Sequence, residues 1–142
     1  MSNAGTVLDI EPALARMVME INALELTDPL LVGIHSGGVW IAEALHQRLG
    51  TRAPLGHLDI SFYRDAFSRM GLHPVVRPSI LPEPVEGRPV ILIDDVLYTG
   101  RTIRAALDAL ADLGRPAAVQ LAVLVDRGHR QLPIRADYVG KN

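Results

Sequence analysis

Two adjacent carboxylates, Asp94 and Asp95, directly follow the apolar run Val90–Ile93. An uninterrupted apolar run of this length is typical of a strand that is buried on both faces of a parallel sheet. Carboxylates at the end of such a strand can accept hydrogen bonds from the hydroxyl groups of a sugar diol, or help to hold Mg²⁺ that is bridged to a ligand. For the pair taken alone, simple solvation of a strand end remains an equally open interpretation.

The segment after the acidic pair has the composition of a phosphate-binding loop. Its residues are Val96, Leu97, Tyr98, Thr99, Gly100, Arg101 and Thr102. The threonine hydroxyls and the N–H groups of the helix that follows would attract a phosphate, and Gly100 would let the backbone approach that anion closely. A phosphate cup beside a diol acceptor predicts a site for a ribose 5-phosphate group.

The composition excludes several other classes of site. The chain has no cysteine, which removes disulfides, thiolate metal sites and cysteine nucleophiles. Lys141 is its only lysine, so a Walker-type phosphate loop, an internal Schiff-base lysine and a phospho-receiver site are all excluded. The formal net charge is −2, so binding to nucleic acid would need a local basic patch.

The length and hydropathy of the chain predict one globular domain. The chain has 142 residues, of which 49% are hydrophobic and 21% are charged. This balance is typical of a folded domain and not of a disordered chain. We expect the domain to cover residues 5–142, with Met1–Ala4 as the remnant of a tag. The chain has neither a bilayer-spanning apolar stretch nor a secretory signal, so the sequence predicts a cytoplasmic protein.

Apolar runs alternate with amphipathic segments along the chain, and this pattern predicts the elements that position the acidic pair. Helices are expected at 10–24, 39–49 and 102–113, and strands at 30–34, 58–62, 90–93, 117–125 and 136–139. The order predicts an α/β fold with a mostly parallel central sheet flanked by helices. Ligands of such sheets bind at the carboxyl ends of the strands, where the loops His35–Gly38, Asp94–Thr102 and Asp126–Arg130 are expected. The irregular segment Tyr63–Arg88 is long enough to suggest a functional loop.

The string Val90–Thr102 resembles the phosphoribosyl diphosphate (PRPP) motif of type I phosphoribosyltransferases. The resemblance covers nearly all of residues 7–142 and is closest to the bifunctional pyrimidine-operon attenuation regulators that are also uracil phosphoribosyltransferases. The segments that carry it are Leu58–Asp65, Gly114–Pro116, Gln120–Arg130 and Leu132–Tyr138. The resemblance implies the type I phosphoribosyltransferase fold. It also implies conversion of uracil and PRPP to UMP and pyrophosphate, with Mg²⁺ bound through the PRPP diphosphate and no metal site made of protein ligands alone.

The resemblance also implies roles for individual residues. Asp94 and Asp95 would bind the ribose hydroxyls of PRPP and, with Arg64, form the catalytic set. The 5-phosphate loop would be 96–102, and the pyrophosphate loop would be Ser36, Gly37 and Gly38. Asp126 and Arg127 would contact the base, and Tyr63–His73 would be a loop that closes over PRPP and excludes water.

The sequence departs from the family pattern at two places. The commoner pyrophosphate loop has an arginine where this chain has Gly37, so a charged donor is missing there. Family members also continue beyond the position of Asn142 with strands that form a hood over the base. We therefore expect those hood strands to be missing and base binding or turnover to be weakened.

Two other functions remain open at this stage. One is a UMP-sensing regulator that binds pyrimidine-operon leader RNA with little or no catalysis, through a patch drawn from the arginines of the second half of the chain. These are Arg101, Arg104, Arg115, Arg127, Arg130 and Arg135. The other is a purine phosphoribosyltransferase, which the string Val125–Arg130 argues against. The resemblance also implies a homodimer or a larger homo-oligomer.

Overall fold

A computed structural model describes residues 10–60, 81 and 83–142 of the chain. The helices are α1 (Ile10–Ala23), α2 (Gly37–Leu49) and α4 (Arg101–Leu113). The strands are β1 (Leu30–Ile34), β2 (Gly56–Leu58), β3 (Pro89–Leu97), β4 (Ala118–Asp126) and β5 (Tyr138–Lys141). The alternation of helices and strands confirms the predicted α/β fold.

The five strands form one sheet in the order β2-β1-β3-β4-β5, and every neighbouring pair is parallel. The register places Leu30 beside Val90 and Leu92 beside Leu121. The chain goes from β1 to β2 in one direction along the sheet, whereas β3, β4 and β5 follow in the other direction. The strand order therefore reverses between β1 and β3, which lie side by side in the middle of the sheet.

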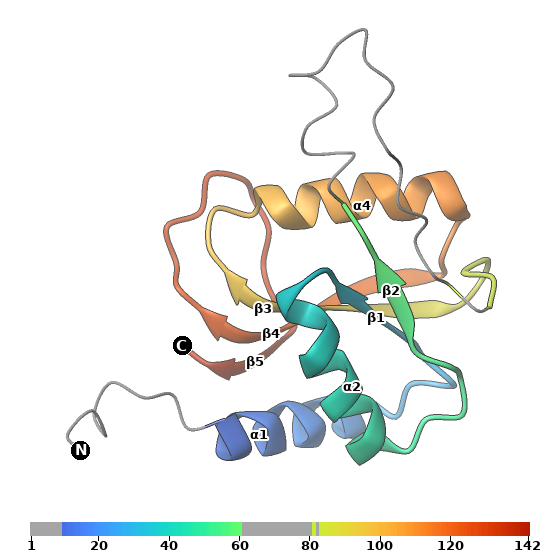
Figure 1. The fold of residues 1–142 in the computed structure, drawn as a ribbon, viewed down its shortest axis with the longest axis horizontal. Coiled ribbons are helices and arrows are strands. Elements are labelled where there is room, and N and C mark those ends of the chain that lie inside the picture. The colour runs from blue at the N-terminus through green and yellow to red at the C-terminus, as the bar shows by residue number, and fades with distance from the viewer. Residues whose placement is uncertain (1–9, 61–80, 82) are drawn as a thin grey trace, which may run out of the picture.

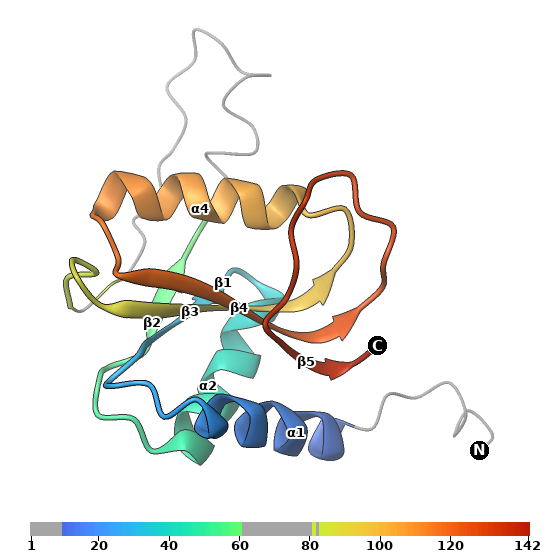
Figure 2. The same cartoon turned by 180° about the vertical axis from the view of Figure 1, so that it is seen from behind.

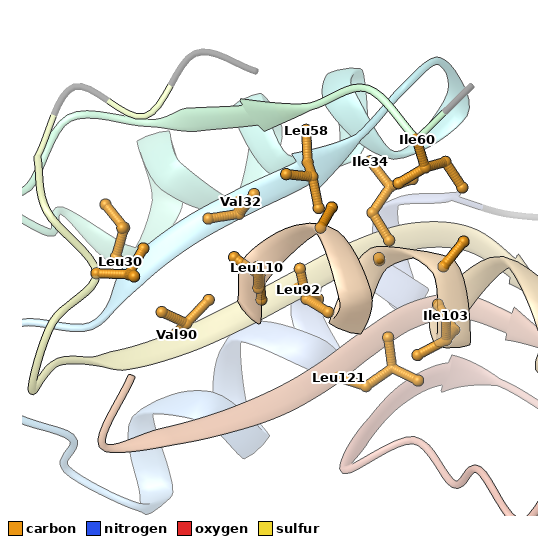
Figure 3. Packing of buried hydrophobic residues seen from close by; sticks show 14 of the residues in the cluster. Leu30, Val32, Ile34, Leu58, Ile60, Val90, Leu92, Ile103, Leu110 and Leu121 are labelled. Carbon is orange, nitrogen blue, oxygen red and sulfur yellow. The ribbon is translucent and has the colours of Figure 1, made fainter. Parts of the chain in front are cut away.

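The helices cover the two faces of the sheet in separate layers. Figures 1 and 2 show α4 over one face and α1 with α2 under the other. The buried side of α4, which includes Ile103 and Leu110, belongs to one apolar cluster with Leu92 and Leu121 of the sheet (Figure 3). On the opposite face, α1 and α2 bury their apolar sides against β1, β3 and β4 in a second cluster. Both faces of the central strands are thus buried, which explains their continuous apolar runs.

Strand β3 is longer than the apolar run that predicts it. We expected a strand at 90–93 and a loop from Asp94, but β3 continues to Leu97. The backbone pairing with β4 continues past the apolar residues, with Val96 beside Val125 and Leu97 beside Asp126. The acidic pair therefore lies within a strand, because ladder hydrogen bonds depend on the backbone and not on side-chain polarity.

The larger differences from the expected boundaries lie in three other elements, whereas α1, α4 and β4 differ by one residue. Helix α2 begins at Gly37, so the glycines predicted in a loop form its first turn, and it ends at Leu49 as predicted, followed by Gly50 in the left-handed conformation (φ 66°). Strand β2 covers Gly56–Leu58 instead of 58–62; Asp59 and Ile60 are buried beyond it, and Ser61 and Phe62 lie outside the described residues. Strand β5 lies two residues later than predicted, at Tyr138–Lys141.

The predicted closing loop cannot be placed in this fold. Arg64 and the whole of Tyr63–His73 lie outside the described residues. The roles given to them therefore stay predictions from the sequence.

Candidate functional site

The carboxyl ends of β1 and β3 form the point where the chain diverges to opposite faces of the sheet. After β1 the chain enters α2 on one face, and after β3 it enters α4 on the other (Figure 1). In open parallel sheets, the crevice between two such diverging connections is where ligands bind. The fold therefore places the predicted pyrophosphate loop and the predicted phosphate loop on the two sides of one crevice.

Gly37 and Gly38 bring the start of α2 into close contact with β3. A β-carbon added at Gly37 would lie 2.1 Å from Oδ2 of Asp95, and one added at Gly38 would lie 2.2 Å from the carbonyl oxygen of Ile93. Neither separation leaves space for a side chain. The second collision is with backbone, so Gly38 is required by the packing of α2 on the sheet, whereas Gly37 leaves space for the Asp95 carboxylate.

The two carboxylates of the acidic pair differ in their surroundings. Asp94 is buried, with 6% of its surface exposed, and its Oδ1 accepts the backbone N–H of Asp95 at 2.9 Å. Asp95 is partly exposed, and its Oδ1 accepts the N–H of Val96 at 2.7 Å while its Oδ2 faces Gly37. Asp95 is thus the member of the pair whose surface a ligand in the crevice can reach.

The predicted phosphate loop borders a pocket of about 610 Å³. All seven predicted residues of the loop, 96–102, line this pocket together with Leu132 and the first turns of α4. Gly100 takes a left-handed conformation (φ 97°), and a β-carbon there would lie 3.1 Å from Cγ1 of Ile134. Gly100, the N-cap of α4, has no side chain to cap the helix, and the hydroxyl of Thr99 accepts the N–H of Arg101 at 3.2 Å. A helix start of this kind suits an anion.

The loop after β4, predicted to contact a base, lies beside the phosphate loop (Figure 1). The N–H of Arg127 donates to the carbonyl of Leu97 at 2.9 Å, and its guanidinium lies 4.2 Å from the centre of the Tyr98 ring. The ring of His129 meets the same tyrosine edge-on, with the ring centres 6.2 Å apart. Arg127 therefore stands next to the phosphate loop, held by a cation–π contact with one of its residues.

The carboxylate of Asp126 is already engaged within its own loop. Its Oδ1 accepts the N–H of Gly128 at 2.9 Å, and its Oδ2 accepts Nη2 of Arg130 at 2.6 Å. These hydrogen bonds, that of Arg130 first, lower the pKa of Asp126 below its usual value, although partial burial opposes them. The Asp126 side chain is therefore oriented toward its own loop by these two contacts.

Sequence analysis gave Arg130 and Gln131 no role in the ligand site: it placed Arg130 in a loop and in the arginine patch, and it did not name Gln131. Gln131 donates its backbone N–H to the carbonyl of Thr99 at 2.8 Å, and its side-chain oxygen accepts Nε of Arg101 at 2.8 Å. Arg130 contacts three separate segments, which are described below. No local signal marks Arg130, because a four-residue spacing of opposite charges predicts an ion pair on a helix, and residues 127–130 form a loop.

His35 follows β1, and sequence analysis gave it no role. Its N–H donates to the carbonyl of Leu58 at 2.9 Å, and its ring meets that of His57 edge-on, with the ring centres 5.5 Å apart. The peptide bond between His35 and Ser36 is cis. These contacts fix the start of the predicted pyrophosphate loop to the neighbouring strand β2.

Four of the six arginines predicted to form a basic patch have side-chain partners. Arg101 pairs with Gln131, Arg104 lies 3.6 Å from Asp108, and Arg127 and Arg130 have the contacts given above. Much of this positive charge is therefore used to fix the loops around the pocket.

Two absences concern only the part of the chain that the structure describes. Within residues 10–60, 81 and 83–142, no three histidine or acidic side chains are grouped so that they could hold a metal ion. In the same residues, no helix has the length and apolar character needed to cross a bilayer.

Comparison with known proteins gives two kinds of relative. Residues 3–142 match the phosphoribosyl transferase domain family. The chain is 56% identical over 140 residues to the bifunctional protein PyrR of Chloroflexus aurantiacus, covering 94% of this chain and 77% of that protein. It is 60% identical over 113 residues to the protein of the same name from Pseudomonas paraeruginosa, covering 80% of this chain and 66% of that protein.

Solved structures with the same fold are more distant in sequence. A hypoxanthine-guanine phosphoribosyltransferase of Bacillus anthracis superposes with a TM-score of 0.75 at 16% identity, covering 96% of this chain and 82% of that chain. A hypoxanthine phosphoribosyltransferase of Staphylococcus aureus gives a TM-score of 0.68 at 25% identity, covering 99% and 82%. At this level of identity these structures support the fold and carry no argument about which base is used.

Proposed function

Because the chain belongs to the phosphoribosyl transferase domain family, and within it to the bifunctional PyrR proteins, we propose that it converts uracil and PRPP to UMP and pyrophosphate. The observation that carries this proposal is the meeting of three loops at one end of the sheet. A partly exposed carboxylate at the end of β3 precedes a loop with two threonines that borders a pocket, and the loop after β4 is hydrogen-bonded to the end of β3. These are the groups that a sugar diol, a phosphate and a base require.

Each part of the substrate would have its own place in the crevice. The ribose hydroxyls would donate to Asp95 and, more deeply, to Asp94. The 5-phosphate would lie against 96–102, where hydroxyl and N–H groups converge at the start of α4. The diphosphate would face Ser36, Gly37 and Gly38 at the start of α2, and the base would lie beside the loop that begins at Asp126.

The transfer needs little acid–base chemistry from the protein. The bond from C1 of the ribose to the diphosphate breaks as positive charge develops on the sugar. N1 of uracil bonds to C1 in its place, and the N1 proton passes to the departing diphosphate or to water. Carboxylates near the ribose stabilise that positive charge, and the oxygen donors of Asp94 and Asp95 also suit Mg²⁺ that is bound to the diphosphate. Mg²⁺ would supply neutralisation of the leaving diphosphate. Arg64, from outside the described residues, is the proposed additional donor to that group.

The test is release of pyrophosphate from PRPP and Mg²⁺ in parallel reactions with uracil, hypoxanthine, guanine and no base. We expect release with uracil alone. Release with a purine instead would contradict the base assignment, and no release with any base would contradict the enzyme assignment.

The Asp95→Asn variant tests the site within the same assay. Asparagine has similar size but no charge, so we expect turnover to fall by about 10²-fold or more with the fold retained. Asp112→Asn, an exposed position at the far end of α4, is the matched control and should keep wild-type turnover. Unchanged turnover in Asp95→Asn would remove the acidic pair from the mechanism.

We also propose a second function, which the name of the relatives favours because it specifies a bifunctional protein. This function is UMP-dependent binding to a pyrimidine leader RNA by a cytoplasmic homodimer or larger oligomer. Because phosphate contacts dominate RNA affinity, binding that appears only with UMP and weakens as salt rises would support it. RNA binding that depends on salt but is the same with and without UMP would instead indicate nonspecific electrostatic attraction between the protein and RNA.

A further inference from the structure

We infer that Arg130 is a positioning residue that holds the base loop (126–129) in the orientation needed to receive uracil above the phosphate loop. This inference rests on the proposed function and deepens it, because it names the residue that orients the loop proposed to receive the base. The residue itself is 23% exposed at its side chain and lies four positions after Asp126.

The guanidinium of Arg130 joins three segments of the chain. Nη2 donates to Oδ2 of Asp126 at 2.6 Å, at the end of β4. Nη1 donates to the carbonyl of Tyr98 at 2.9 Å, in the phosphate loop. Nε donates to the carbonyl of Ile134 at 2.8 Å, in the segment that packs against Gly100. A planar guanidinium has donors on several sides, whereas a lysine ammonium is a single point and cannot reach three such acceptors together.

The backbone conformation of the base loop is one that needs stabilising contacts from neighbouring side chains. Gly128 and His129 both have positive φ angles, 77° and 61°. The value at His129 is unfavourable for a residue with a side chain, and such a conformation persists only where the surroundings enforce it. The Asp126–Gly128 hydrogen bond fixes the first half of the turn, and Arg130 fixes that carboxylate in its turn.

The phosphate loop has supports that do not involve the Arg130 side chain. The carbonyl of Thr99 accepts the backbone N–H groups of Gln131 and Leu132 at 2.8 and 3.2 Å, and the loop continues directly into α4. Removing the guanidinium should therefore disturb the base loop more than the phosphate loop. The effects on the two loops can be measured separately. In the proposed site, ribose 5-phosphate contacts the phosphate loop and not the base loop, whereas UMP contacts both.

The experiment compares dissociation constants for UMP and for ribose 5-phosphate by titration calorimetry, on the wild type and on Arg130→Met. We expect UMP affinity to fall about tenfold or more and ribose 5-phosphate affinity to change by less than about twofold. Arg130→Lys, which keeps the charge beside Asp126, should restore part of the UMP affinity. Arg52→Met, at an exposed arginine before β2, is the matched control and should bind both ligands as the wild type does.

Two results would overturn the inference. Equal weakening of both ligands would show a general loss of structure, and unchanged UMP affinity would show that the loop keeps its orientation without Arg130. If Arg130→Met does not fold, the same comparison is made on Arg130→Lys, with a smaller selective loss of UMP affinity expected. Failure of the proposed function is a different result, since the wild type would then release no pyrophosphate with uracil, whether or not it binds UMP.

Discussion

The backbone of Gly37, at the start of α2, lies against the carboxylate of Asp95 on β3. The family pattern has an arginine at this position, and its loss first suggested a weaker pyrophosphate site. In the structure, the space that a side chain would need is taken by the carboxylate of Asp95. The absence of a side chain at Gly37 therefore leaves space for the Asp95 carboxylate beside the start of α2.

This contact makes Gly37→Ala a test of the site that separates activity from stability. The new β-carbon would collide with the movable end of Asp95, which can rotate, so the free energy of unfolding should change by less than about 1 kcal/mol. Turnover should fall because the carboxylate is displaced. Urea unfolding and the pyrophosphate assay measure the two effects.

Two further variants control this prediction. In Gly38→Ala the collision is with the carbonyl of Ile93, which cannot move aside, so stability itself should fall by about 1–3 kcal/mol. The double variant Gly37→Ala/Asp95→Asn should be no less active than Asp95→Asn alone, because both changes act through one carboxylate. Full turnover in Gly37→Ala would contradict this account.

Residue types and spacing located the candidate site, but not its contacts. Asp94, Asp95 and the threonines were found because they follow an apolar strand. The approach of Gly37 to Asp95 and the position of Arg130 depend on loops that are distant in the sequence and meet only in the fold. Sequence patterns within one segment contain no information on such contacts.

At the scale of elements, hydrophobic pattern predicted which segments are helices and strands better than where they end. Strand β1 and the C-terminal end of α2 were predicted correctly, because an apolar run bounded by turn residues and a glycine cap are local signals. The continuation of β3 to Leu97 was missed because its last residues are held by pairing with β4. That pairing places the acidic pair on a rigid strand instead of a loop.

Helix α4, whose start borders the predicted phosphate loop, is anchored by its apolar side. Leu110 is 1% exposed and packs in the cluster between α4 and the sheet (Figure 3). Leu113 in the same helix is 48% exposed. We expect Leu110→Ala to lower the free energy of unfolding by about 2–5 kcal/mol, from lost burial and the cavity left behind. Leu113→Ala should change it by no more than about 0.5 kcal/mol. Denaturant unfolding compares the two, and equal losses would contradict the packing described for α4.

At the scale of the whole molecule, the site joins elements from both layers. The start of α2 lies under the sheet and the start of α4 lies over it, and the two helices follow the neighbouring strands β1 and β3 (Figure 2). A ligand that contacts both sides binds only the folded chain and should stabilise the molecule as a unit.

This expectation can be measured as a thermal shift. PRPP at about 100 times its dissociation constant should stabilise the fold by about 2.7 kcal/mol, and so raise the Tm by roughly 5–10 °C. Ribose 5-phosphate and pyrophosphate, added separately at the same concentrations, should give smaller shifts, because in the proposed site only PRPP would contact the starts of both α2 and α4. A shift no larger than that of ribose 5-phosphate alone would contradict a joined site.

The central position of β1 and β3 also has a consequence for the order of events during synthesis. Leu30 pairs with Val90, so the strands that bound the crevice come from distant parts of the chain. A ribosome that has released only β1, α2 and β2 has produced half of the crevice, with neither the acidic pair nor the phosphate loop. Because distant pairings form slowly, substrate binding should first become possible when translation has passed α4 and the middle of the sheet has closed.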